Sequence, residues 1–195
     1  MSSKRSARQI ELIEAAGKIL TKSGVGGLTT KNLAAEMNFS ESAIYRHFSG
    51  KEEIITAMLN YLAENMEARY STACQTADTV EEQFRCLFQN QCSFFHEHPH
   101  FVAVVFSDGL MEQSESINQA IMQVMQVKRK YLIPILTEGQ AKGIFKTEIN
   151  AAELASIVMG AFRLQMFQWK ISGFSTDIKA QGDSLINSLL TLIKS

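Results

Sequence analysis

Residues 28–51 of the chain read LTTKNLAAEMNFSESAIYRHFSGK, and this stretch decides the fold. Its spacing predicts two short helices separated by a turn too tight for an ordinary loop. In the first helix, apolar side chains from Leu33 to Met37 recur on one face. Thr29 or Thr30 can cap the amino end of this helix with a side-chain oxygen.

A second helix, residues 41–48, is expected directly after a turn at Asn38. Asparagine tolerates the left-handed backbone that such a turn often needs, and Ser40 is a good N-cap. Ile44 and Phe48, four residues apart, form an apolar face. The other side carries hydrogen-bonding side chains, namely Ser42, Tyr45, Arg46 and Ser49. A helix, a tight turn and a short helix with exposed polar side chains describe a helix–turn–helix.

Several residues of this stretch occur together at a characteristic spacing: Thr29-Thr30, Leu33-Ala34, Ser40, Ile44-Tyr45-Arg46-His47-Phe48 and Lys51. With them the chain resembles the amino-terminal domain of TetR/AcrR-family transcriptional regulators. The Tyr-x-His-Phe ending followed closely by lysine is the most specific part. The resemblance covers roughly the first quarter of the chain and beyond it is one of architecture and length. Asn38 and Phe39 depart from the family, which usually has glycine and a smaller aliphatic residue there.

The resemblance implies an all-α protein of about nine helices in two domains. Residues 1–50 are expected to form a three-helix DNA-binding head, and residues 51–195 a larger helical domain for effector binding and dimerisation. The presence of only 2 prolines also favours long helices. Caps and apolar periodicity place the other helices near residues 6–23, 51–73, 79–98, 100–110, 114–142, 150–171 and 176–193. Pro134 is expected to kink the helix that contains it.

Charge is unevenly distributed although the net charge is only −1. Residues 1–51 hold 8 Lys or Arg against 4 Glu, a balance of +4, and the remainder holds 11 against 16, a balance of −5. A basic amino-terminal segment fits a surface for phosphates. Uneven charge on a solvated surface is the alternative explanation.

The helix–turn–helix and the resemblance together predict contacts with double-stranded DNA at a palindromic operator. Arg46 is the best candidate to read a base, because a guanidinium can pair bidentately with guanine in the major groove. By resemblance, Tyr45, His47 and Lys51 hold phosphates, and a phosphate is also favoured at the helix start near Thr29. The full set of candidate DNA contacts is Thr29, Thr30, Ser40, Ser42, Ala43, Tyr45, Arg46, His47 and Lys51. An amino-terminal arm with Lys4, Arg5 and Arg8 either reaches DNA or is a disordered, solubilising segment.

The second domain is rich in Phe and Met, and family members often enclose an apolar small-molecule effector in this region. Side chains of this kind suit an adaptable hydrophobic pocket, although they suit an ordinary helical core as well. The candidate ligand-binding residues are Phe94, Phe95, Phe106, Met125, Phe162, Met166 and Trp169. Polar residues at otherwise apolar positions are possible anchors for the ligand: Gln91, Arg163, Gln165 and Gln168. The last two helices are expected to form a homodimer, as in TetR-like proteins.

Three functions are compatible with these patterns. The first is a dimeric repressor released from its operator by a hydrophobic small molecule. The second is a DNA-bound family member whose second domain engages a protein partner, for example in cell-division control. The third is a helical enzyme or carrier with an incidental helix–turn–helix, which is disfavoured because no catalytic motif is apparent.

No cofactor or metal is expected. His96 and His98 lie about 200° apart on a helix, and Pro99 interrupts the path to His100, which disfavours a shared metal ion. Cys74, Cys86 and Cys92 lack close ligand spacing and are interpreted as cytosolic thiols. No apolar run has the length of a membrane span, so a cytoplasmic, nucleoid-associated protein without membrane contact is expected.

Overall fold

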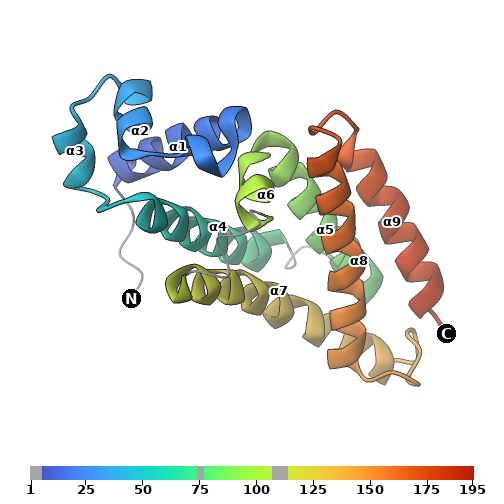
Figure 1. Ribbon diagram of the computed structural model, residues 1–195. Coiled ribbons are helices and arrows are strands. Elements are labelled where there is room, and N and C mark those ends of the chain that lie inside the picture. Colours follow the sequence, from blue (N-terminus) through green and yellow to red (C-terminus); the bar gives the residue numbers. More distant parts are fainter. Residues whose placement is uncertain (1–5, 74–76, 107–113) are drawn as a thin grey trace. The chain divides into compact units, whose positions relative to one another are not determined.

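The computed structural model describes residues 6–73, 77–106 and 114–195, and every regular element in these ranges is a helix (Figure 1). The helices are α1 (Ala7–Gly27), α2 (Thr30–Met37), α3 (Glu41–Tyr45), α4 (Lys51–Ala73), α5 (Val80–Glu97), α6 (His100–Val105), α7 (Glu115–Ala141), α8 (Ala151–Ile171) and α9 (Ile178–Ile193). The expectation of an all-α fold is therefore confirmed. Of the residues singled out above, Lys4, Arg5 and Cys74 lie outside the described residues.

The chain divides into two compact units. Unit 1 comprises residues 1–62 and 99–123, and unit 2 comprises residues 63–98 and 124–195. Helices α4 and α7 each contribute residues to both units, so the chain passes between them without a loop at these points. A domain boundary at residue 50 stays a prediction.

Local signals explain where most helices begin and end. Thr79 and Glu82 form a reciprocal capping box at the start of α5, and the Asn150 side chain accepts a hydrogen bond from the Glu153 N–H at the start of α8. Helix α9 begins after Asp177, which accepts from the Lys179 and Ala180 N–H groups. The helix predicted at 176–193 starts two residues later in the structure, because Asp177 is its N-cap.

Helix α1 continues beyond its expected end at residue 23. Its regular backbone is interrupted at Gly24, where φ is +64° and ψ is −170°, and helical structure resumes as far as Gly27. Glycine adopts this φ without steric cost, so the interruption occurs at a residue that tolerates it. The expected end of the helix corresponds to this interruption.

Unit 1 has a core of aliphatic and aromatic side chains. Helix α1 packs against α2 and α6, and α2 packs against α3. The buried side chains of this core include Leu12, Ile13, Leu20, Leu33, Ile44, Phe48, Ile54 and Met58. Because α3 has only one buried residue of its own, Ile44, this core fixes the short helix from one side only.

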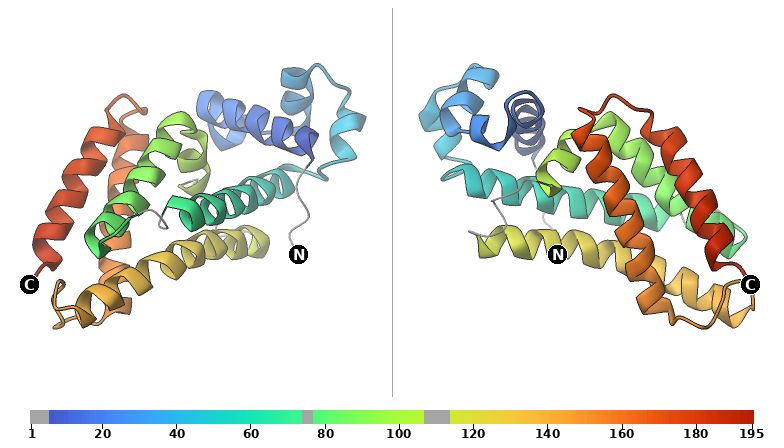
Figure 2. Two further views of the ribbon diagram at one scale, coloured as in Figure 1. Left: turned by 180° about the vertical axis from the view of Figure 1, so that it is seen from behind. Right: turned by 45° about the vertical axis from the view of Figure 1, so that its right-hand side comes forward.

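In unit 2, helix α9 packs against α5 and α8, as the two further views in Figure 2 also show. The approach of α9 to α5 depends on Gly182, because a Cβ atom there would lie 2.4 Å from the Cys92 Sγ atom. Phe145 is completely buried, and a Cβ atom at Gly139 would lie 2.0 Å from its ring. Pro134 lies inside α7, and helical structure continues on both sides of it. None of the helices in the described ranges has the length and apolar character to cross a bilayer.

Candidate functional site

The corner of the helix–turn–helix is formed by backbone geometry at Asn38. This residue has φ 54° and ψ 44°, in the left-handed region, and ends α2. The Phe39 N–H then donates to the Ala34 carbonyl oxygen at 2.8 Å, which closes the turn. The Arg8 guanidinium carbon lies 4.0 Å from the Phe39 ring centroid. Arg8, expected in the arm, thus contacts the turn in the free protein.

Helix α3 is shorter than the expected 41–48. It begins after Ser40, whose Oγ accepts from the Ala43 N–H at 3.3 Å, and it ends at Tyr45. The His47 and Phe48 N–H groups both donate to the Ile44 carbonyl, which tightens the last turn. Phe48 is still buried at 5% exposure, so the apolar face predicted with Ile44 exists without a regular helix through residue 48.

The face of the head opposite Ile44 is exposed and polar. Seven candidate DNA contacts are exposed, namely Thr29, Ser40, Ser42, Tyr45, Arg46, His47 and Lys51, and two are partly buried, Thr30 and Ala43. The Thr30 Oγ1 donates to the Tyr45 Oη at 3.1 Å and so joins the start of α2 to the end of α3. Tyr45 is 54% exposed despite its size. Most of these residues are therefore accessible to a ligand, and their contacts with DNA stay a prediction.

Lys51 is the first residue of α4 and has a defined backbone environment. The Glu53 carboxylate accepts from the Ser49 N–H at 2.7 Å and from the Ser49 Oγ at 2.8 Å. These hydrogen bonds lower the pKa of Glu53 below its usual value, so this carboxylate is ionised at neutral pH. They also tie the segment between α3 and α4 to the first turn of α4, where Lys51 is exposed.

Within unit 1 the start of α4 is connected to the start of α7, a contact that the sequence analysis did not identify. The Glu52 carboxylate accepts from the hydroxyl groups of Ser114 and Ser116, the latter at 2.7 Å. Hydrogen bonds from Ser114 and Ser116 lower the pKa of Glu52. The Thr56 and Ser116 hydroxyls lie 3.2 Å apart. No local pattern could reveal this cluster, since its members are about sixty positions apart.

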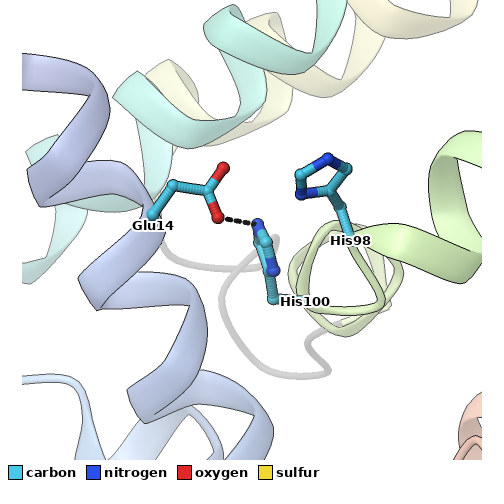
Figure 3. Close-up of side chains that lie close together, drawn as sticks. All are labelled: Glu14, His98 and His100. Carbon is cyan, nitrogen blue, oxygen red and sulfur yellow. Dashed lines mark ion pairs between the residues drawn. The ribbon is translucent and has the colours of Figure 1, made fainter. Parts of the chain in front are cut away.

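Elsewhere in unit 1, α6 packs closely on α1. The His100 Nε2 lies 3.8 Å from a Glu14 carboxylate oxygen. A dashed line marks this contact in Figure 3. A Cβ atom at Gly17 would lie 2.5 Å from the His100 ring, so glycine is needed for this approach. His96 is exposed in the last turn of α5, and the His98 ring at the end of α5 lies 4.7 Å from the Phe94 ring. His98 thus ends α5, and His100 is the first residue of α6.

The candidate ligand-binding residues do not form one group. Phe94, Phe95, Phe162, Met166 and Trp169 are buried in unit 2, whereas Phe106 belongs to unit 1 and Met125 is 39% exposed. The Phe162 ring packs against Phe88 at 5.1 Å, while the Trp169 Nε1 donates to the Thr176 carbonyl at 3.0 Å. Trp169 therefore stabilises the connection between α8 and α9. A ligand role for these residues stays a prediction.

A polar cluster in unit 2 was only partly anticipated. It consists of Arg69 on α4 and Gln91 on α5, which are hydrogen-bonded to each other, and of Lys128 on α7, whose ammonium group is repelled by the Arg69 charge. The Lys128 Nζ lies 4.1 Å from the Phe162 ring centroid. Gln91 is completely buried, and its Oε1 accepts from the Arg69 Nη2 at 3.1 Å. One sequence pattern could have identified Lys128. It lies four positions after Val124 and four before Leu132, so it is a basic residue on an apolar face of the helix.

Burial controls the electrostatics of this cluster. Desolvation lowers the pKa of Lys128 to about 8, and the neighbouring charges of Arg69 and Arg163 act in the same direction. Desolvation also lowers the pKa of Arg69 and raises the pKa of the Cys92 thiol to about 11. The Cys92 thiol is therefore protonated and unreactive at neutral pH.

Comparisons with known proteins agree with this arrangement. Residues 12–58 match the family described as bacterial regulatory proteins, tetR family, and residues 57–192 match the family of the YsiA-like protein C-terminal region. The chain belongs to the TetR family, and it is a DNA-binding transcriptional regulator that carries a helix–turn–helix.

The chain is similar over nearly its whole length to individual members of the family. It is 26% identical to the nucleoid occlusion factor SlmA of Colwellia psychrerythraea over 185 residues, which is 92% of each chain. Its fold is similar to that of the fatty acid degradation regulator FadR of Bacillus halodurans, with a TM-score of 0.85, 18% identity and coverage of 96% and 97% of the two chains. FadR of Bacillus subtilis in complex with stearoyl-CoA gives a TM-score of 0.82 at 18% identity, with coverage of 94% and 98%.

The exposed position of Arg46 leads to a prediction about sequence preference. Arg46→Ala should weaken binding to the matched operator by about 1–3 kcal/mol and relax specificity, because a bidentate base contact is lost. Fluorescence anisotropy with matched and scrambled DNA measures both effects. An equal loss on the two sequences would contradict a base contact.

Lys51→Ala provides the contrast, because a phosphate contact carries no sequence information. This variant should weaken binding to all sequences alike and reduce the slope of log K against log salt by about one.

The partly buried position of Lys128 predicts an effect on stability. Lys128→Met should raise the free energy of unfolding by about 1–3 kcal/mol at pH 7, because the protonated amine is disfavoured in the folded state. The folded pKa lies below the unfolded one, so the wild-type protein gains stability as pH rises from about 8 to about 10.5. Urea denaturation at pH 7 and pH 10.5 measures this, and the gain from the substitution should nearly vanish at the higher pH. A destabilised variant at pH 7 would contradict the assignment.

Proposed function

We propose that the protein is a dimeric repressor that a hydrophobic small molecule releases from a palindromic operator. The observation that carries this proposal is the division of α8 into two apolar faces. One face contributes Phe162 and Met166 to the interior of unit 2. The other leaves Ile157, Leu164 and Ile171 exposed by 54%, 56% and 68%. A single helix thus lines the interior that would hold the effector and the surface that would meet a second copy.

The exposed face of α8 has the properties of a self-association surface. Ile157, Leu164 and Ile171 are seven residues apart, and such a row turns by only about 20° per step around a helix. Gly160 lies between them with no atom within 4 Å of a Cβ position, which leaves room for close approach of another helix. On α9, Leu192 is 68% exposed. Apolar side chains at this density are typical of interfaces and uncommon on isolated surfaces.

A groove runs beside this face along α8 and α9. Its volume is about 540 Å³, and its lining includes Gln165, Gln168, Gln181, Ser184 and Ser188. The polar lining suits the rim of a protein interface better than a site for an apolar molecule. We therefore assign Gln165 and Gln168 to the dimer surface, although the sequence suggested them as ligand anchors.

Communication with the DNA-binding head would use the helices shared by the two units. Helix α4 carries Lys51 at its first position and Arg69 near its end, and α7 begins at the contact with Glu52 and continues to Lys128. An effector that binds one conformation better draws population toward it. Release follows if that conformation holds the two recognition helices of a dimer away from the spacing of about one helical turn that adjacent half-sites require.

The relatives support two different candidate functions for this protein. FadR of Bacillus subtilis is described in complex with stearoyl-CoA, which supports an acyl ligand for the shared fold. The SlmA relatives are described as nucleoid occlusion factors, which supports a second candidate function. In this alternative, the DNA-bound protein engages a protein partner through its second domain and needs no small ligand.

The dimer surface can be tested with Leu164→Arg. Burying an unpaired guanidinium in an apolar interface is costly, so this variant should be monomeric at micromolar concentration and bind the operator at least about tenfold more weakly. Light scattering coupled to size exclusion measures the mass, and anisotropy measures affinity. Gln126→Arg, at an exposed position of α7, is the control for an added surface arginine and should remain dimeric. A dimeric Leu164→Arg protein would place the interface elsewhere.

Regulation can be tested with the DNA upstream of the protein's own gene. We expect a salt-resistant, sequence-specific complex that is lost in Arg46→Ala and dissociates on addition of an apolar ligand. A complex that resists all such ligands, together with a partner protein that crosslinks to wild-type protein but not to Arg46→Ala in cells, would favour the protein-partner alternative. Binding that is weak and abolished by moderate salt would contradict the repressor assignment for this operator.

A further inference from the structure

Two cationic side chains in unit 2 lie among aromatic rings. The Lys128 Nζ is 4.1 Å from the centroid of Phe162 and 5.8 Å from that of Phe88. The Arg69 guanidinium is 4.2 Å from the centroid of Phe94. Across the described ranges, neither cation is within ion-pair distance of a carboxylate. Partly buried cations without a counter-ion are unfavourable in a folded protein. A bound anion would offset this cost.

Two carboxylates of unit 2, Glu67 and Asp183, have other partners. Glu67 is bound by the Lys130 Nζ at 2.5 Å and by the Tyr131 hydroxyl at 2.7 Å. Asp183 accepts a hydrogen bond from the Gln89 Nε2 at 2.7 Å. Among the residues that the structure describes, Arg69 donates to neutral oxygen atoms, on Asn65, Asn90 and Gln91. The positive charge of Arg69 and Lys128 is therefore available to a ligand.

Gln91 gives an independent indication of a ligand. Its side chain is completely buried, and its Oε1 accepts from the Tyr70 hydroxyl at 2.8 Å and from Arg69 at 3.1 Å. Its Nε2 donates to no atom among the described residues. Buried donors almost always have an acceptor, because an unsatisfied one costs about 1–3 kcal/mol. The orientation of the amide follows from its Oε1, which already accepts two hydrogen bonds.

The missing group must therefore accept hydrogen bonds and carry negative charge. Carboxylates and phosphates have only acceptor oxygens when ionised, and they form strong charge-assisted hydrogen bonds with guanidinium and ammonium groups. The rings of Phe88, Phe94 and Phe162 provide apolar contact for a hydrocarbon portion. We propose that Arg69, Gln91 and Lys128 bind the anionic head group of an amphipathic effector. This inference rests on the proposed ligand response and specifies the chemical class of the effector.

The test compares probes that share a tail and differ in the head group. Decanoate, decyl phosphate and decan-1-ol are titrated into the full-length protein at pH 7 by isothermal calorimetry. We expect decanoate, decyl phosphate or both to bind at least about tenfold more tightly than the alcohol, as a charge-assisted interaction provides. The anion with the lower Kd identifies a carboxylate or a phosphate as the preferred head group.

Two variants assign the effect to these residues. Lys128→Met conserves volume and removes the charge, and Gln91→Glu adds a carboxylate that pairs with Arg69 and repels an anion. Each should raise the Kd of the anionic probe about 10- to 100-fold and leave the Kd of decan-1-ol within about twofold. Lys130→Met is the matched control, because Lys130 is exposed on the same helix and pairs with Glu67. It should leave both constants unchanged.

Several outcomes would overturn the proposal. They are equal binding of acids and alcohol, no binding of either anion by the wild-type protein, or an equal effect of Lys130→Met and Lys128→Met. Operator release is measured separately by anisotropy with the same probes. Release by decan-1-ol alone would keep the repressor function and refute the anion site. Binding of an anion at Lys128 without release would keep the site and refute the ligand-responsive function.

Discussion

The DNA-binding head depends on the left-handed backbone of Asn38. This residue ends α2 and turns the chain so that α3 starts three residues after it, at Glu41, with Ser40 as the cap. Most L-residues resist this conformation, but asparagine adopts it at low cost. Because α3 is a helix of only five residues, it has little stability of its own. Its position is fixed by the turn on one side and by burial of Ile44 and Phe48 on the other.

Helix α3 has one face that packs in the core of unit 1 and another that is exposed to solvent. Burial of Ile44 fixes the rotation of α3, and the residues on its other side are consequently exposed. The hydrogen bond between Thr30 and Tyr45 adds a second connection between the helices at that surface. The contacts of Ser49 with Glu53 hold the chain where α4 begins. A preorganised surface loses less conformational entropy on binding than a flexible one.

Unit 2 combines features that do not favour its own stability. Lys128 is desolvated, and the Gln91 amide donor lacks an acceptor among the described residues. Large apolar side chains also remain exposed on α8. Natural proteins retain unfavourable groups mainly where binding requires them. The polar cluster and the exposed face of α8 are the two surfaces of unit 2 that we propose for binding.

The sequence by itself determined the helices and the exposed face of the head. Caps such as Thr79 with Glu82, the apolar spacing of Ile44 and Phe48, and the tolerance of Asn38 are local properties, each involving residues within about one turn. Local patterns were less reliable for exact ends, as α3 and α9 show, because a competing cap or turn decides them. Only the tertiary structure brought Arg69, Gln91 and Lys128 together and linked Glu52 to Ser116. These residues lie on different helices, and their proximity depends on how the helices pack.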